Sequence, residues 1–184
     1  MEITDQLCNK VVTIASGNKN EEDIVTRYLI QYADDSVTYK QILPNGSERV
    51  QIKNLLGETI TTTEINSGTT RFLYDSKGHL RFTQDQQMCA TGTCRYEKWD
   101  CFGRSRENGL VTCREEFTKL QQYVDLTDWP LKEDGAIVLQ QKDYGSFEKD
   151  PEQLGNLTGI QQYKESGDYG NGCSIVYDNR NRIK

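Results

Sequence analysis

Residues 59–84, TITTTEINSGTTRFLYDSKGHLRFTQ, decide the fold that the sequence predicts. Two turn signals, Asn66-Ser67-Gly68 and Asp75-Ser76-Lys77-Gly78, divide this stretch into three short runs rich in Thr and in aromatic or branched residues. Such residues favour strands, whereas Asn, Asp and Gly supply the backbone conformations that tight turns need. The stretch therefore predicts three antiparallel strands joined by short hairpins.

The same spacing of strands and turns continues upstream. Residues 24–32 alternate, with Tyr28, Ile30 and Tyr32 on one face. Asn45-Gly46 is a strong hairpin signal, because both residues tolerate the positive φ values of a tight turn. The expected strands are 24–32, 37–43, 49–54, 59–65, 70–74 and 79–84. Six strands with such short connections predict a mainly β fold, an antiparallel meander that closes into a barrel or folds into a sandwich.

Downstream, the pattern becomes less regular. The cysteine-rich stretch 89–113 predicts strands at 94–101 and 110–113, and a helix is expected near 113–124. Phe117, Leu120 and Val124 fall on one stripe of that helix. Further strands are expected at 135–141 and 173–177, and 142–172 is expected to be a long surface loop. Residues 11–14 suit either a first strand or a short helix, and residues 1–184 are expected to form a single domain.

Composition excludes several classes of protein. The chain has 184 residues, a formal net charge of −6 and 35% hydrophobic residues. An acidic chain lacks the basic face that binds a nucleic-acid backbone, so no nucleic-acid partner is expected. No apolar run approaches the length of a transmembrane helix, so no membrane span is expected. The acidic start at Met1 lacks the apolar region of a signal peptide, as it would in a cytosolic protein or in a mature domain with an added Met.

Six cysteines favour disulfides and an oxidising compartment, and so a secreted or extracytoplasmic location. We expect Cys8 to pair with Cys173, and the central four to pair among themselves. Those four are Cys89, Cys94, Cys101 and Cys113. Their spacing does not match the close pairs typical of structural zinc sites, so no metal is expected. Two sequons, at Asn45 and Asn156, agree with a secreted glycoprotein.

The sequence offers little support for catalysis. His79 is the single histidine, and its place after Gly78 predicts an exposed turn residue. No serine lies in a nucleophile-elbow motif. Tyr32-Ala33-Asp34-Asp35 resembles the paired-carboxylate motif of polymerases, but the short acidic chain favours a simple turn. We therefore expect no catalytic residue and no cofactor, and a binding protein is favoured over an enzyme.

Aromatic residues are spread over most of the predicted strands. In a barrel, inward-facing rings with a few hydroxyl groups line an apolar pocket. The alternative is that these rings simply form the core. The candidate ligand-binding residues are Tyr28, Tyr32, Tyr39, Phe72, Tyr74, Phe82, Tyr96 and Trp99.

A strand meander, then Tyr96-Glu97-Lys98-Trp99, then Cys113 before a helix with Phe117, resembles the layout of lipocalins. The likeness is strongest to the secreted salivary lipocalins of arthropods, in which a Glu-x-Trp strand precedes a Cys-bearing helix. The Gly-x-Trp signature of the first lipocalin strand is absent. The resemblance implies an eight-stranded barrel with a small-molecule cavity, no catalysis, and sequestration of host amines or lipids.

Three classes of function follow from these patterns. The first is a disulfide-braced β-barrel or sandwich that binds a small hydrophobic or amphipathic molecule. The second is an interaction module that contacts a protein partner through exposed loops near 100–110 and 142–172. The third is a chromophore-handling or acid–base enzyme built on a β-barrel. The sequence fixes neither the ligand nor the disulfide connectivity.

Overall fold

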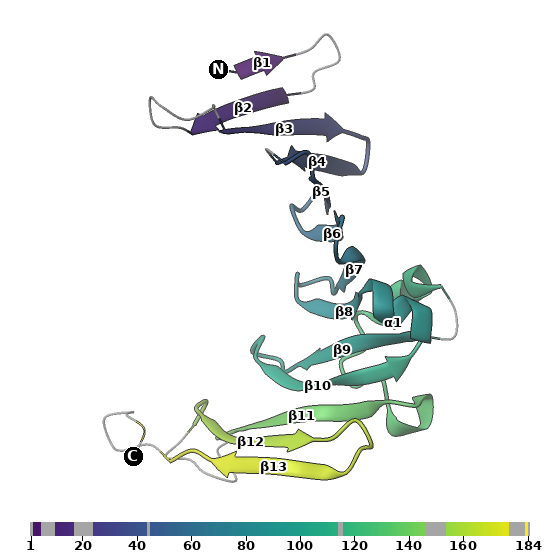
Figure 1. Cartoon of the computed structure of the whole chain (residues 1–184). Coiled ribbons are helices and arrows are strands. Elements are labelled where there is room, and N and C mark those ends of the chain that lie inside the picture. Colours follow the sequence, from purple (N-terminus) through teal and green to yellow (C-terminus); the bar gives the residue numbers. More distant parts are fainter. Residues whose placement is uncertain are drawn as a thin grey trace. The chain divides into compact units, whose positions relative to one another are not determined.

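The computed structural model describes residues 2–4, 10–16, 24–43, 45–113, 116–145, 154–176 and 183. The chain is mainly β, and the described residues form thirteen strands in one sheet whose strand order is the chain order (Figure 1). The strand pairings described are antiparallel, as in a meander of successive hairpins. A mainly β antiparallel meander was expected from the sequence and is confirmed.

The expected closure into a barrel is wrong. Among the described residues, the sheet order begins at β1 (Glu2–Thr4) and ends at β13 (Tyr169–Ser174), and these two strands do not pair with each other. The eight-stranded barrel implied by the lipocalin resemblance is therefore not formed. Closure needs a matched strand tilt and shear around the whole sheet, whereas a meander only requires each strand to pair with the one before it.

The chain divides into two compact units. The first unit comprises Met1–Leu73 and Gln84–Ala90, and the second comprises Tyr74–Thr83 and Thr91–Lys184. We call them unit 1 and unit 2 and describe each by itself.

Unit 1 consists of strands β1 to β7 and a short helix. The strands after β1 are β2 (Lys10–Ser16), β3 (Ile24–Tyr32), β4 (Ser36–Ile42), β5 (Glu48–Asn54), β6 (Thr59–Glu64) and β7 (Gly68–Tyr74). The segment around 11–14 is thus a strand. The helix α1 (Gln86–Thr91) was not expected from the sequence.

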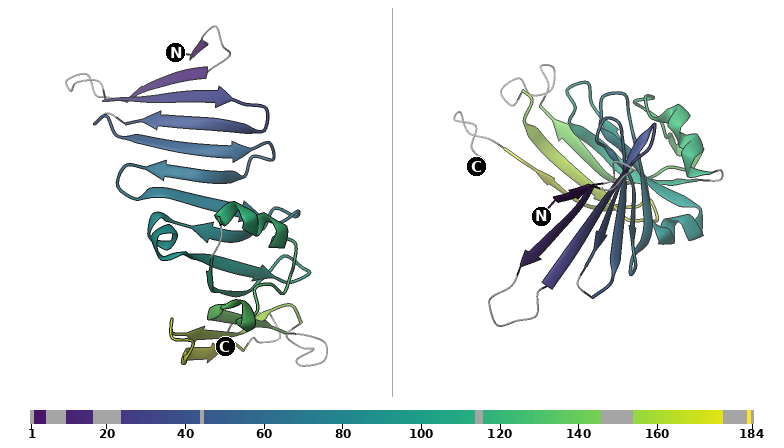
Figure 2. Two further views of the ribbon diagram at one scale, coloured as in Figure 1. Left: turned by 90° about the vertical axis from the view of Figure 1, so that its right-hand side faces the viewer. Right: turned by 90° about the horizontal axis from the view of Figure 1, so that it is seen from above.

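Strands β4 to β7 have no fully buried side chain among their described residues. In Figure 2 these strands form a single layer. Cross-strand pairs replace a core: Thr63 and Thr69 hydroxyl oxygens lie 3.0 Å apart, and Arg49 forms a 2.8 Å ion pair with Glu64. Each such pair contributes about 0.2–1 kcal/mol, so the layer relies on many of them.

Unit 2 holds the buried core. Its strands are β8 (Leu80–Gln84), β9 (Thr93–Trp99), β10 (Ser105–Thr112), β11 (Ile137–Tyr144), β12 (Leu157–Tyr163) and β13. The buried apolar side chains are Phe82, Cys94, Tyr96, Val111, Cys113, Phe117, Leu120 and Val124. The stripe predicted at Phe117, Leu120 and Val124 is therefore confirmed as core.

The helix expected at 113–124 is instead a 3-10 helix, η1 (Phe117–Tyr123), followed by a second short one, η2 (Lys132–Asp134). In η1 the Lys119 amide donates to the Glu116 carbonyl three residues earlier, at 2.9 Å. The carbonyls at the end of this segment are bonded by a side chain from β8, as described below. External hydrogen bonds thus take the place of α-helical ones, which suits a short 3-10 segment.

The long surface loop expected over 142–172 is also wrong. Most of its described residues lie in β11, β12 and β13. Its Gln, Gly and Tyr residues do not alternate in hydropathy, so the strand signal was missing. Side-chain hydrogen bonds stabilise these strands instead: the Tyr163 hydroxyl donates to the Gln161 amide oxygen at 2.8 Å. The last strand ends at Ser174, and the expected end at 177 lies outside the described residues.

The turns that follow β5, β7 and β9 share one local structure. Each begins with an Asx residue, Asn54, Asp75 or Asp100, whose Oδ1 accepts main-chain N–H groups two and four residues later. The fourth residue of each is a glycine with positive φ, at 84°, 84° and 73° in chain order. The side chain of the fifth residue then contacts the Asx side chain. An Asx-x-x-Gly signature thus marks every second hairpin from β5 to β10.

Candidate functional site

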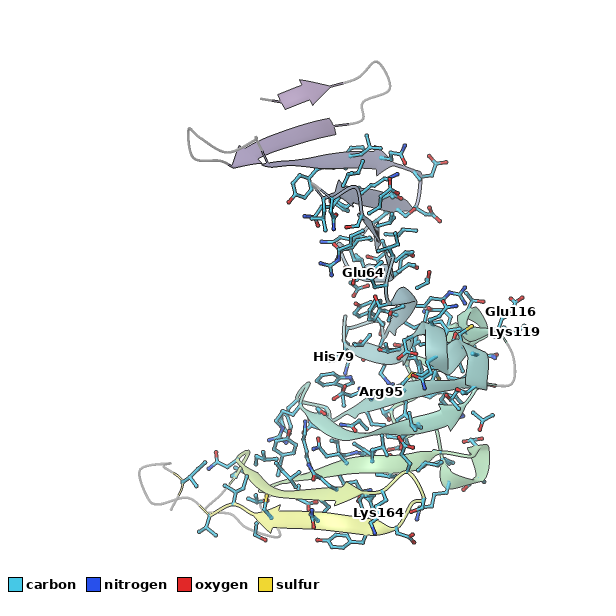
Figure 3. All side chains as sticks on the ribbon, in the orientation of Figure 1. Glu64, His79, Arg95, Glu116, Lys119 and Lys164 are labelled. Atoms are coloured by element: carbon cyan, nitrogen blue, oxygen red, sulfur yellow. The ribbon has the colours of Figure 1, made fainter. Side chains whose placement is uncertain are left out.

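A groove of about 470 Å³ lies in unit 2 between the end of β10 and the two 3-10 segments. Leu120, Tyr123 and Trp129 supply its apolar side. Five charged residues line it as well, namely Glu116, Lys119, Lys132, Glu133 and Asp134. Figure 3 labels Glu116 and Lys119 at the start of η1. Its volume is within the range of small-molecule sites, and polar groups supply most of its lining beside this apolar side.

Two aromatic rings form the central feature of the groove. Tyr123 and Trp129 stack with centroids 4.3 Å apart and an interplanar angle of 11°. Phe82 packs edge-on against Trp129, with centroids 5.5 Å apart, and so ties the pair to the core. Among the described residues, no hydrogen bond reaches the Trp129 indole N–H or the Tyr123 hydroxyl. Both rings are half-buried, so these two polar groups are open to a ligand or to water.

The position of Trp129 depends on Arg81 of β8. Arg81 is 2% exposed, and its guanidinium donates to the carbonyls of Val124, Leu126 and Trp129, the last two at 3.1 and 2.9 Å. Its Nε donates to the Glu97 carbonyl of β9 at 2.8 Å. Burial lowers the pKa of Arg81, and Asp75 and Asp125 oppose that shift. The segment 124–129 is therefore fixed to the sheet by one buried side chain.

A buried polar network lies between β9, β10 and β11. Glu107 accepts hydrogen bonds from Tyr96 at 2.9 Å and from Gln141 at 2.9 Å, and it forms a 2.8 Å ion pair with Lys98. The Lys98 and Glu107 side chains are only 7% and 12% exposed. The Tyr163 hydroxyl oxygen lies at the edge of the network, 3.1 Å from the Gln141 side-chain oxygen. Every polar group at its centre is thus paired, which favours a structural role.

The pKa values in this network follow from its geometry. Burial acts to raise the pKa of Glu107, but the hydrogen bonds from Lys98, Gln141 and Tyr96 and the Lys98 charge lower it overall. Burial raises the pKa of Tyr96, and the neighbouring Glu107 carboxylate adds to that rise. Glu107 is therefore ionised and Tyr96 is protonated at neutral pH. Neither group is poised to exchange a proton near neutrality, as an acid–base catalyst must.

A second exposed feature of unit 2 joins two loops. Arg104 donates to the Gly155 carbonyl at 2.8 Å, which brings the 100–104 turn against residue 155. Its guanidinium lies 4.2 Å from the Tyr144 ring centroid and 5.0 Å from that of Phe102. Phe102 is 78% exposed and Leu154 is 61% exposed. We call Phe102, Arg104, Tyr144 and Leu154 the loop patch.

The eight aromatic residues proposed as ligand contacts do not line the groove. Tyr28, Tyr32, Tyr39 and Phe72 belong to unit 1, and Tyr74, Phe82, Tyr96 and Trp99 belong to unit 2. Phe82 and Tyr96 pair directly across β8 and β9 and are fully buried, so these two are core residues. Tyr32, by contrast, is 64% exposed.

The Trp99 side chain contacts the end of the turn that precedes β8. Its ring stacks on His79 with centroids 5.0 Å apart, and its indole N–H donates to the Leu80 carbonyl at 2.9 Å. His79 Nδ1 lies 3.0 Å from Asp75 Oδ2, and the histidine side chain is 25% exposed. His79 is labelled in Figure 3 at the start of β8. The expectation of a simply exposed histidine is therefore wrong, because the ring fills the space over Trp99.

Sequence reasoning missed the residues that build the groove. Tyr123 lay at the end of a predicted helix, and Trp129 was read only as part of a helix stop. Arg81 looked like an ordinary polar strand residue, and nothing near it in the chain marks it as buried. The Trp129-Pro130 pair close to a charged segment was the one local signal of an ordered, non-helical turn.

The five described cysteines form no disulfide with one another. They are Cys89, Cys94, Cys101, Cys113 and Cys173, and the proposed partner Cys8 lies outside the described residues. Within the same part of the chain, no group of three or more His, Cys, Asp or Glu side chains is placed to hold a metal ion. A search of the described helices found none with the length and hydropathy needed to cross a membrane.

Comparisons with known proteins place the chain in no family. No family model matches it, and no curated protein matches it. Among solved structures, a chain in a mutant Tc holotoxin pore of Photorhabdus luminescens is similar, with a TM-score of 0.40 and 15% identity. That similarity covers 96% of the present chain and 9% of the other, so this chain spans less than a tenth of that protein's length.

Proposed function

We propose that this protein is a non-catalytic binding module that holds a small amphipathic molecule in the groove of unit 2. The observation that carries the proposal is the stacked Tyr123–Trp129 pair, whose two polar groups have no partner among the described residues. A ligand with an apolar body would pack on Leu120 and the rings. Its polar end would accept from the indole N–H and the phenol, where water is otherwise the partner.

Preorganisation supports this reading. Phe82 and the Arg81 hydrogen bonds hold Trp129 before any ligand arrives. A ligand therefore loses little free energy to ordering the site, which is the usual cost of binding to loop segments. The fully paired Glu107 network, in contrast, offers no vacant acid or base, which disfavours the enzyme alternative.

The location remains part of the proposal. Six cysteines and two sequons support a secreted or extracytoplasmic protein. Asn45 is exposed in the turn between β4 and β5, as a glycosylation acceptor must be. Secretion from a eukaryotic host, followed by mass measurement before and after glycan removal, tests this assignment. A chain that is retained in the cell would contradict it.

The binding test uses the full chain and a panel of fatty acids, biogenic amines and tetrapyrroles. Native mass spectrometry detects a retained molecule, and a melting-temperature increase detects an added one. Trp129→Phe and Tyr123→Phe each keep a ring but remove one hydrogen-bond donor. Each should weaken binding by about threefold to tenfold, the effect of one neutral hydrogen bond.

Tyr32→Phe is the matched control, because it removes an exposed phenol in unit 1. It should leave the affinity unchanged. No melting-temperature response across the whole panel, together with no co-purified molecule, would overturn the proposal.

The loop patch favours a second candidate function, a protein-binding surface. The two loops that the sequence suggested for a protein partner are the ones that Arg104 brings together. Arg104 and Tyr144 are residue types enriched in interface hot spots, and Phe102 adds an exposed ring beside them. A partner with an apolar side chain and an accessible carboxylate would suit this surface.

The second candidate is tested by photo-crosslinking from position 102 in an extract of the organism that makes the protein. The affinity of the purified partner is then measured. Phe102→Ala should weaken binding at least tenfold if the ring is a hot spot. Leu56→Ala is the control, since Leu56 is an exposed turn residue of unit 1. Equal effects of the two substitutions would remove the loop patch from consideration.

A further inference from the structure

The described cysteines fall into two classes. Cys89, Cys101 and Cys173 are exposed, whereas Cys94 and Cys113 are buried in unit 2. Cys94 is 0% exposed and Cys113 is 8% exposed. Free cysteines are often buried one at a time as small apolar residues. Two buried cysteines close to each other need a different explanation.

The β9–β10 register brings these two residues together. Cys94 lies opposite Val111, and Cys113 follows two residues later, so both project from the same side of the hairpin. The Cys113 amide donates to the Gly92 carbonyl at 2.8 Å, which continues the pairing beyond the end of β10. The Cys94 thiol is hydrogen-bonded to that of Cys113, so the two sulfur atoms are neighbours.

We propose that Cys94 and Cys113 are a redox pair, and that they form an intramolecular disulfide when the protein meets a disulfide oxidant such as oxidised glutathione. The sequence left the pairing among the four central cysteines open. The structure selects this pair because the two thiols are hydrogen-bonded neighbours on one face of the β9–β10 hairpin.

The exchange reaction is balanced with one molecule of oxidant. The Cys113 thiolate attacks a sulfur of oxidised glutathione, and the first glutathione leaves as a thiol. Cys94 then loses its proton and attacks the Cys113 sulfur, and the second glutathione leaves. The two protein thiols are oxidised and one disulfide is reduced to two thiols. Cys113 is the entry point, since it lines the groove while Cys94 is fully covered.

Burial raises the pKa of the Cys94 thiol, and Cys113 adds to that rise. Cys94 therefore keeps its proton until the mixed disulfide is formed at Cys113.

The bond would fix the start of β9 to the chain just before η1. That position forms one wall of the groove, so oxidation would stiffen the site whether or not a ligand binds there. The inference does not depend on the proposed function. A disulfide with a loop of this length should raise the melting temperature by roughly 5–10 °C.

The test uses the full chain in which the other four cysteines are removed by Cys8→Ser, Cys89→Ser, Cys101→Ser and Cys173→Ser. After equilibration with oxidised glutathione, peptide mapping without reductant should find the Cys94–Cys113 link. Thiol titration of the denatured protein should show the loss of two thiols, and the melting temperature should rise. Reduction with dithiothreitol should reverse all three changes.

The control adds Cys113→Ser to that protein and should give no intramolecular link and no change in melting temperature. Because serine at this buried position could impair folding, mapping of the unsubstituted chain provides an independent readout. Glutathione adducts at the exposed cysteines with Cys94 and Cys113 still reduced at equilibrium would overturn the proposal. A dominant link between any other pair would do the same.

Discussion

The Arg81 guanidinium donates a 2.9 Å hydrogen bond to the main-chain carbonyl of Trp129, the residue that anchors the groove of unit 2. The two residues are 48 positions apart in the chain. The same guanidinium bonds the carbonyls of Val124 and Leu126. One side chain therefore satisfies three carbonyls of a segment that has no regular α-helical bonding of its own.

Arg81→Met should destabilise the protein by about 3 kcal/mol or more, because the carbonyl of the buried Val124 and those of Leu126 and Trp129 each lose a hydrogen bond from a charged donor. Urea unfolding of the full chain measures this change. The substitution should also weaken binding in the groove, since Trp129 would no longer be fixed.

Arg95→Met is the matched control for that prediction. Arg95 lies on the neighbouring strand β9, is exposed, and is labelled in Figure 3. Its loss should change the unfolding free energy by no more than about 0.5 kcal/mol. Similar destabilisation by both substitutions would show that the buried hydrogen bonds of Arg81 are not the cause.

The ionisation of Glu107 should make the stability of the folded protein change with pH in the acid range. Its pKa is lowered in the folded protein, since the donors around the carboxylate outweigh its burial. A carboxylate whose pKa is lower in the folded protein stabilises the fold at pH values above its unfolded pKa of about 4.3. This stabilisation is lost as the pH falls from there through the folded pKa. Melting temperatures measured from neutral to acid pH should fall in that window.

Glu107→Gln should destabilise the protein at neutral pH by about 3 kcal/mol, because Lys98 would be left buried without a counter-charge. The acid-dependent part of the melting curve should become smaller. Glu64→Gln, which breaks an exposed pair with Arg49, is the control and should cost less than about 1 kcal/mol. An unchanged pH profile in Glu107→Gln would contradict the assignment.

Gly109→Ala should be strongly destabilising. A Cβ at this position would lie 2.1 Å from the Ile137 carbonyl oxygen and 2.8 Å from the Tyr96 ring. The neighbouring strand and a core ring would both have to move, at a cost of about 3 kcal/mol. Gly167→Ala tests backbone strain alone, since its φ is +83° with no atom within 4 Å, and should cost about 1 kcal/mol. Chemical denaturation of both variants separates the two effects.

Asp100→Ala should disorder the turn after β9 without unfolding the core. The Asp100 carboxylate accepts the main-chain N–H groups of Phe102 and Arg104, and it pairs with the Arg104 guanidinium at 2.6 Å. We expect a loss of about 1–2 kcal/mol and faster hydrogen exchange at 100–104. Asp34→Ala, in the exposed turn after β3, should be near neutral. Unchanged exchange at 100–104 would contradict this role for Asp100.

Much of the strand pattern could be predicted because its signals are local. Each of two correct predictions rests on a signal only a few residues long. One is the strand that contains Tyr28, Ile30 and Tyr32, and the other is the turn at Asn45-Gly46. The stripe of Phe117 and Leu120 was also visible, and both are buried. Strand β12 and the start of β13 were missed, because their Gln and Gly residues give no periodic hydrophobic signal.

By itself, the sequence determined a mainly β meander with short hairpins, since strand propensity and turn chemistry act over a few neighbouring residues. Only the tertiary structure decided that the sheet stays open, because closure depends on tilt and stagger summed over all strands. Only the tertiary structure brought Arg81 to the carbonyl of Trp129 and Cys94 to Cys113. Those contacts arise when separate elements pack around a shared core, and no short stretch of sequence records which partners will meet.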